Sequence, residues 1–217
     1  MSTPSAPGTH SDEVRARITG VEEALPPGES LVWEGQPDVK TLAFRVLYLR
    51  AILVYWALVA VGFLAAGALG GRGSGSLAAD LVWLMVVAAA GSALIFGLAA
   101  AIRSSTTYAL TDRRVVIRMG VAFPSVLNLP LHQIDAVDVR ATGKDREGRE
   151  VGDLVLTPIG GEQVGWLYLW PHVKPWSWRT PAPALRAIPE AAYVGKLVAR
   201  HAKARLDQLQ GEREDTA

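Results

Sequence analysis

Histidines and carboxylates close together in the sequence are the first candidates for chemistry. His132 is followed by Asp135 and Asp138, a combination that could serve acid–base catalysis or hold a metal ion. In a strand, Asp135 would point away from the face of His132, because successive side chains alternate between faces. The other histidines of interest, His172 and His201, form no ligand set with a recognisable spacing. We therefore predict no catalytic residue, no cofactor and no metal site.

The composition excludes further classes of function. The chain has no cysteine, which rules out disulfides, thiol chemistry and cysteine-ligated zinc. Its formal net charge is +1, and no long basic block offers a surface for nucleic acid. Half of the 217 residues are hydrophobic and the mean hydropathy is +0.20. This apolar excess indicates membrane-spanning segments.

A tract rich in tryptophan and proline runs from Trp166 to Pro189. If its first part is the last strand of a sheet, alternation leaves Leu167 and Leu169 facing the core and the aromatic rings facing outward; the reverse assignment stays open. The rings could rest on the membrane surface, anchor a partner protein or pack internally. The candidate interface residues are Trp166, Tyr168, Trp170, His172, Trp176 and Trp178.

Two uncharged segments, 51–69 and 81–102, are each long enough to cross about 30 Å of hydrocarbon as a helix. We predict a transmembrane hairpin over 46–103, with helices at about 48–70 and 80–102 joined by a glycine and serine loop. Neither helix contains an ionisable group in its core, which argues against transport. Neither offers a histidine to ligate a pigment.

Basic residues flank the hairpin at its open end, before the first helix and after the second, opposite the connecting loop. They are Lys40, Arg45 and Arg50 before it, and Arg103, Arg113 and Arg114 after it. The connecting loop offers only Arg72, so the positive-inside bias predicts that both termini are cytoplasmic. The predicted juxtamembrane basic group is Arg103, Arg113, Arg114 and Arg118. We assign it to topology and orientation rather than to a dedicated lipid site.

The remainder of the chain alternates in the manner of short strands and ends in a helical pattern. Residues 104–209 predict a small antiparallel β-barrel or sandwich with a C-terminal amphipathic helix at about 189–209. Residues 21–45 predict a cytoplasmic segment in which Leu31–Trp33 is a candidate for one further strand. Residues 1–20 and 210–217 are predicted to be disordered. The predicted fold class is therefore membrane-anchored α+β.

Several segments, in this order, resemble the membrane-anchored bacterial pleckstrin-homology (PH-like) domain family. They are LPPGESLVWEGQP (25–37), the paired hydrophobic helices, YALTDRRVVIRMG (108–120) and LPLHQIDAVDV (129–139). The tract LWPHVKPWSWRTPAPALRAIP further resembles the C-terminal region of the PuhB family, the photosynthetic-complex assembly proteins of purple and related phototrophic bacteria.

The resemblance implies a noncatalytic assembly factor in the bacterial inner, photosynthetic membrane. The implied partners are subunits of the reaction centre and of the core light-harvesting complex, together with the lipid bilayer. Self-association into a homodimer stays open. The alternative is a general bacterial PH-like membrane module that binds lipid headgroups or peptides outside photosynthesis.

Overall fold

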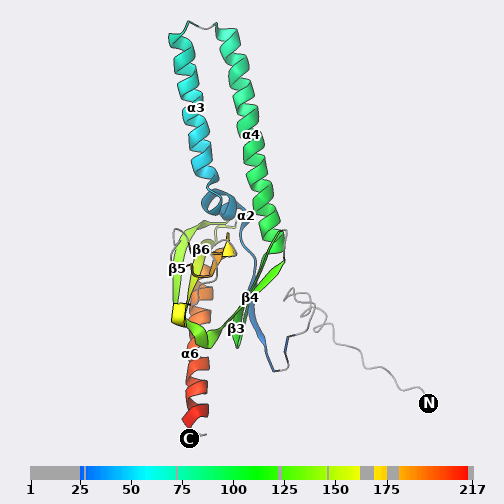
Figure 1. Cartoon of the computed structure of the whole chain (residues 1–217), viewed down its shortest axis with the longest axis vertical. Coiled ribbons are helices and arrows are strands. Elements are labelled where there is room, and N and C mark those ends of the chain that lie inside the picture. The colour runs from blue at the N-terminus through cyan, green and yellow to red at the C-terminus, as the bar shows by residue number, and fades with distance from the viewer. Residues whose placement is uncertain are drawn as a thin grey trace, which may run out of the picture.

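The fold combines a long helical hairpin with a globular part built from two sheets and a C-terminal helix (Figure 1). The computed structural model describes residues 25–26, 28–71, 73–121, 124–145, 147–161, 169–174 and 181–214. The α+β class is as predicted from the sequence, and so is the order of hairpin, strands and final helix. Most of residues 1–20 and 210–217, predicted to be disordered, lie outside the described part, but 210–214 continue the last helix.

The hairpin consists of α3 (Leu49–Leu69) and α4 (Ser74–Ser105). Both helices have a mean hydropathy of 2.3, and only 6% and 0% of their apolar windows are buried, so by length and composition they could cross a membrane. The second helix begins earlier than the predicted residue 80, because Leu77 packs against α3 and extends the helix. A Cβ atom on Gly67 would lie 2.2 Å from Leu77 Cδ2, so the two helices approach closely at this point.

The first sheet is antiparallel with the strand order β1-β2-β3-β4. Its strands are β1 (Leu31–Gly35), β2 (Thr107–Thr111), β3 (Arg114–Met119) and β4 (Ser125–Pro130). The candidate strand at Leu31–Trp33 is thus confirmed, although the hairpin separates it in sequence from its partner β2. Pro130 ends the edge strand β4, a position that tolerates a residue without a backbone N–H.

The second sheet is antiparallel with the order β5-β6-β7. Its strands are β5 (Ile134–Lys144), β6 (Glu150–Pro158) and β7 (Ala184–Pro189). Pro189 ends β7 rather than starting the final helix, contrary to our prediction. The pairing of Val151 with Pro189 explains the difference, because β6 offers this segment a ladder that local sequence signals do not reveal.

The C-terminal helix α6 (Ala191–Glu214) lies against the second sheet and points away from the hairpin (Figure 1). Val194 and Val198 of α6 are fully buried and share one core cluster with Tyr108, Leu154 and side chains from both sheets. The predicted amphipathic stripe is therefore the face that packs. The helix covers the sheet so closely that a Cβ atom on Gly195 would lie 2.5 Å from Val139 Cγ2.

A short segment joins β1 to the hairpin and packs the base of the hairpin against the globular part. It comprises α2 (Val39–Thr41) and a π-helical stretch η1 (Leu42–Val46). Asp38 caps α2, because its carboxylate accepts a hydrogen bond of 2.7 Å from the backbone of Thr41. A second buried cluster joins this segment to α4, β6 and β7. It contains Leu42, Ala43, Val46, Leu49, Ala99, Ile102, Val151 and Ala187.

Candidate functional site

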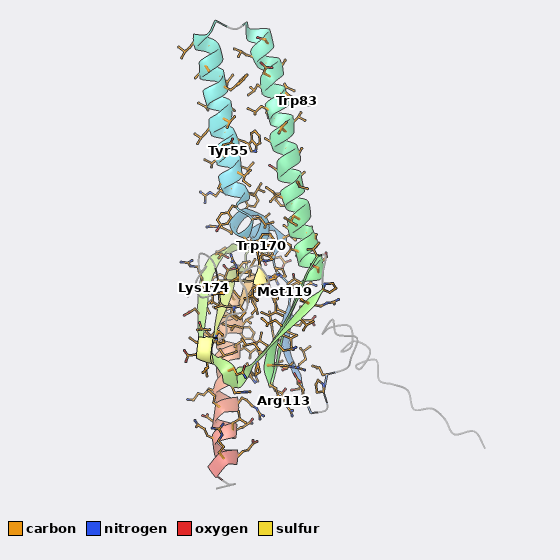
Figure 2. All side chains as sticks on the ribbon, viewed as in Figure 1. Tyr55, Trp83, Arg113, Met119, Trp170 and Lys174 are labelled. Atoms are coloured by element: carbon orange, nitrogen blue, oxygen red, sulfur yellow. The ribbon has the colours of Figure 1, made fainter. Side chains whose placement is uncertain are left out.

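Only some of the predicted interface residues of the aromatic tract lie in the described part of the chain. Trp166, Tyr168, Trp176 and Trp178 lie outside the described residues. Trp170 lies in a turn rather than in the predicted strand, and 44% of it is exposed. Figure 2 shows Trp170 at the end of the globular part that faces the hairpin. Leu169, predicted to face the core, is fully buried.

His172 is buried, so its assignment to an exposed interface is wrong. Only 1% of it is exposed. Its Nδ1 atom lies 2.7 Å from the Tyr108 hydroxyl and its Nε2 atom 3.2 Å from Thr106 Oγ1. The Tyr108 ring also meets the imidazole edge to face at 5.6 Å. These contacts fasten the tract to the point where α4 ends and β2 begins.

The hydroxyl of Tyr108 connects this histidine to β7. It accepts a hydrogen bond from the backbone N–H of Arg186 at 3.1 Å. Its single proton is best given to the closer acceptor, His172 Nδ1, which leaves Nε2–H to donate to Thr106. Every polar atom in this chain of contacts then has a partner.

An ion pair completes the buried polar cluster, which we define as Thr106, Tyr108, Asp153, His172 and Arg186. The Arg186 Nε atom lies 3.1 Å from Asp153 Oδ2, and the two side chains are 9% and 4% exposed. At this distance the two groups form an ion pair, but Nε is not aligned for a hydrogen bond. Arg186 Nη1 donates to the Val173 carbonyl, and Asp153 Oδ1 accepts from the Ala187 N–H, each at 2.9 Å.

Burial sets the protonation of this cluster. It lowers the pKa of His172 to about 4, with a smaller contribution from the positive charge of Arg186. Burial likewise raises the pKa of the Tyr108 hydroxyl well above its usual range. Near neutral pH the imidazole is uncharged, the phenol keeps its proton and the carboxylate is paired. The cluster holds together the start of β2, strands β6 and β7, and the segment around His172.

We expect the stability of the protein to depend on pH through His172. Its folded pKa of about 4 lies below the usual value, so between about pH 6.5 and 4 the unfolded chain binds a proton that the folded chain does not. The free energy of unfolding should therefore fall with decreasing pH, by roughly 1 kcal/mol per pH unit from this group. Denaturant unfolding of wild-type and His172→Asn protein across this range measures the difference in slope.

The matched control for that measurement is His132→Asn, because His132 is exposed on the 3-10 turn before β5. This variant should keep the wild-type slope. Equal slopes for wild type and His172→Asn would contradict the buried, neutral histidine.

The predicted juxtamembrane arginines divide into two groups. Arg103 belongs to the last turn of α4, and Arg118 pairs with Thr107, directly after that helix. Arg113 lies at the opposite end of the globular part, far from the hairpin, as Figure 2 shows. The strand β2 runs away from the helices, so the turn at its far end cannot be juxtamembrane. The prediction is wrong for Arg113 and for its neighbour Arg114.

Those two arginines hold the segment before β1 instead. Arg114 makes two hydrogen bonds to the Glu29 carboxylate, at 2.8 and 3.0 Å, and Arg113 donates to the Gly28 carbonyl at 2.9 Å. The backbone N–H groups of both arginines also bond Thr111 Oγ1, which shapes the turn. Their charge therefore serves the fold of the N-terminal segment.

Four members of the cluster were missed in the sequence: Thr106, Tyr108, Asp153 and Arg186. The available signal was a single charged residue inside each of two apolar runs, GDLVLTPIG and ALRAIP. Charged residues are seldom fully buried unless paired, so two such residues are candidates for each other. Within the described part of the chain, no group of three or more His, Cys, Asp or Glu residues could hold a metal ion.

Comparison with known proteins agrees with this architecture. A model of the bacterial PH domain family matches residues 42–202. The chain is also 30% identical, over 196 residues, to an uncharacterized 23.7 kDa protein encoded in the puhA 5′ region of Rhodobacter capsulatus; the match covers 88% of this chain and 87% of that protein. No solved structure matches. Because the family model spans well over half of the sequence, from the base of the hairpin into α6, the chain belongs to the bacterial PH domain family.

Proposed function

We propose that this protein is a noncatalytic membrane assembly factor for the photosynthetic reaction centre and its core light-harvesting complex. The observation that carries the proposal is the relative of Rhodobacter capsulatus, an uncharacterized protein encoded in the puhA 5′ region. The match covers nearly the whole of both proteins, so helices and globular part are shared together. The resemblance of the Trp/Pro tract to the PuhB family adds support.

In this proposal the hairpin crosses the bacterial inner membrane twice and both termini are cytoplasmic. The support is the exposure of the apolar side chains on both helices together with the basic residues before α3 and after α4. Figure 2 shows side chains along the whole length of both helices, and Tyr55 and Trp83 are 60% and 70% exposed. Lipid or the helices of a partner would cover these faces.

The polar cluster gives the scaffold its rigidity. Thr106 is the C-cap residue of α4, Tyr108 lies in β2, and Arg186 and Asp153 belong to the second sheet. Hydrogen bonds among them tie the hairpin to both sheets. A partner subunit held by the helices would therefore keep a fixed position relative to the cytoplasmic domain. The neutral histidine and the paired carboxylate support a noncatalytic role.

Trp170 and the other rings of the tract would supply the contact surface of the domain. The position of Trp170 at the end facing the hairpin supports contact with the membrane surface or with the cytoplasmic part of a membrane-bound partner. We retain Trp166, Tyr168, Trp176 and Trp178 as proposed members of the surface. His172 is withdrawn from it.

A second candidate function is a general PH-like module that binds lipid headgroups or peptides in another pathway. The family match favours it, since that match alone carries no link to photosynthesis. The two candidates differ in one testable respect. Only under the first are pigment–protein complexes expected to depend on this protein.

Deletion of the gene in a phototrophic host separates the two candidates. We expect a strong loss of reaction-centre and core-antenna absorbance in isolated membranes, because subunits would no longer be held during assembly. The measurement is the near-infrared spectrum of the membranes, with restoration by the wild-type gene as the control. Unchanged spectra in the deletion strain would reject the assembly role and leave the second candidate.

Complementation of that strain then tests the aromatic surface. Trp170→Ala is expected to restore the complexes only partly, whereas Tyr193→Ala, which removes an exposed ring from α6, should restore them fully. Co-purification of tagged variants with reaction-centre and antenna subunits identifies the contact. Equal restoration by both variants would contradict the role of Trp170.

A further inference from the structure

The base of α3 carries a second surface feature that the assembly role does not explain. The stretch from Leu42 to Leu49 has one face against the globular part, where Leu42, Val46 and Leu49 are buried. On its other face, Arg45 is exposed. Tyr48 adopts a left-handed backbone conformation, with φ 57° and ψ 26°, and thereby bends the chain between η1 and α3.

The bend creates a groove of about 470 Å³. The described residues that line it are Phe44, Arg45, Tyr48, Arg50, Ala51 and Val54. None of these six is acidic, and two are arginines. One wall is fixed, because the Phe44 ring meets the Phe96 ring of α4 edge to face at 5.7 Å.

The groove changes from cationic to apolar along the helix. Arg50 lies in the first turn of α3, and Val54, four residues later, lies one turn further along the same face. In a membrane-inserted hairpin, this turn would lie at the boundary between headgroups and acyl chains. The two arginines would be at headgroup level, and Ala51 and Val54 at the level of the first methylene groups.

We propose that this groove binds one anionic phospholipid. The guanidinium groups of Arg45 and Arg50 hold the phosphodiester by charge-assisted hydrogen bonds, and one acyl chain lies along Ala51 and Val54. Arginine suits a phosphate better than lysine, because its planar fork offers several donors at once. The absence of acidic side chains among the described lining residues favours an anion over a zwitterion. The inference rests on the membrane insertion proposed above, not on the assembly role.

Native mass spectrometry of the full chain in detergent, titrated with dioleoyl phosphatidylglycerol or dioleoyl phosphatidylcholine, tests the proposal. We expect phosphatidylglycerol to bind about thirtyfold more tightly, the contribution of two arginines beside an anionic headgroup. The double variant Arg45→Gln/Arg50→Gln should lose that preference, because its affinity for phosphatidylglycerol should fall further than its affinity for phosphatidylcholine. Glycerophosphoglycerol, which has no acyl chains, should compete only weakly.

The matched control is Arg140→Gln/Arg200→Gln, which removes the same charge from two exposed positions of the globular part. It should change the affinity by less than about twofold, because distant charges are screened. Equal binding of the two lipids by wild type, or equal losses in both double variants, would overturn the proposal. Alkaline carbonate extraction of membranes from the same cells separates the failures: an extractable chain overturns membrane insertion and this site together, whereas an inserted chain without lipid preference overturns the site alone.

Discussion

Replacement of Arg186 by methionine is expected to lower the free energy of unfolding by about 3–5 kcal/mol. Methionine fills a similar volume, but the Asp153 carboxylate would then be buried without its cation, and the Val173 carbonyl would lose its donor. Denaturant titration in mild detergent, followed by tryptophan fluorescence, measures the change. Arg200→Met, at an exposed position of α6, is the control and should alter the value by less than about 0.5 kcal/mol.

A double variant separates the lost charge balance from lost packing. Asp153→Asn combined with Arg186→Met removes both charges, while the amide oxygen can still accept the hydrogen bond from the Ala187 N–H. We expect this protein to be more stable than Arg186→Met alone by at least about 1 kcal/mol, because no unpaired charge remains buried. If the single variant loses less than about 1 kcal/mol, the pair does not stabilise the junction in the way its burial suggests.

Replacement of Leu58 by arginine should strongly reduce membrane insertion. Leu58 lies near the middle of α3 and 67% of it is exposed. In a spanning helix, this change would raise the free energy of insertion by about 3–4 kcal/mol. The fraction of protein that resists alkaline carbonate extraction of membranes measures the effect.

Leu69→Arg is the matched control for depth. Leu69 is the last residue of α3 and 91% of it is exposed, so an arginine there can extend its charge to the headgroups. This variant should stay in the membrane at nearly the wild-type level. Equal extraction of the two variants would show that depth in a bilayer is irrelevant to α3, and the hairpin would then need another explanation.

The aromatic tract shows where interpretation of the sequence reaches its limit. Leu169 is buried and Trp170 is exposed, as predicted, but the two residues lie outside a strand, so the alternation from which the prediction was made does not apply to them. The same reasoning placed His172 on the surface, where a polar ring without a visible partner belongs. Its partners, Thr106 and Tyr108, lie 66 and 64 residues away in the sequence. No pattern within the tract indicates such contacts.

The basic residues show the same limit in another form. Counting arginines beside the hairpin predicted one juxtamembrane group, since all four lie within residues 103–118, at and just after the end of α4. A strand advances about 3.3 Å per residue, so β2 carries Arg113 and Arg114 well away from the helix end. There they meet Gly28 and Glu29, which precede the hairpin in sequence. Only the return of β3 brings Arg118 back beside Thr107.

The sequence by itself determined the features that depend on neighbouring residues: the two apolar helices, the strand pair after them and the packed stripe of α6. Hydropathy and periodicity report these directly, because each element buries or exposes its own face. Tertiary structure alone decided the pairing of β1 with β2, the strand β7 at the end of the proline tract, and the burial of His172 with Arg186 and Asp153. The physical reason is that a buried polar group or an edge strand is stable only beside a partner, and here each partner comes from a distant part of the chain.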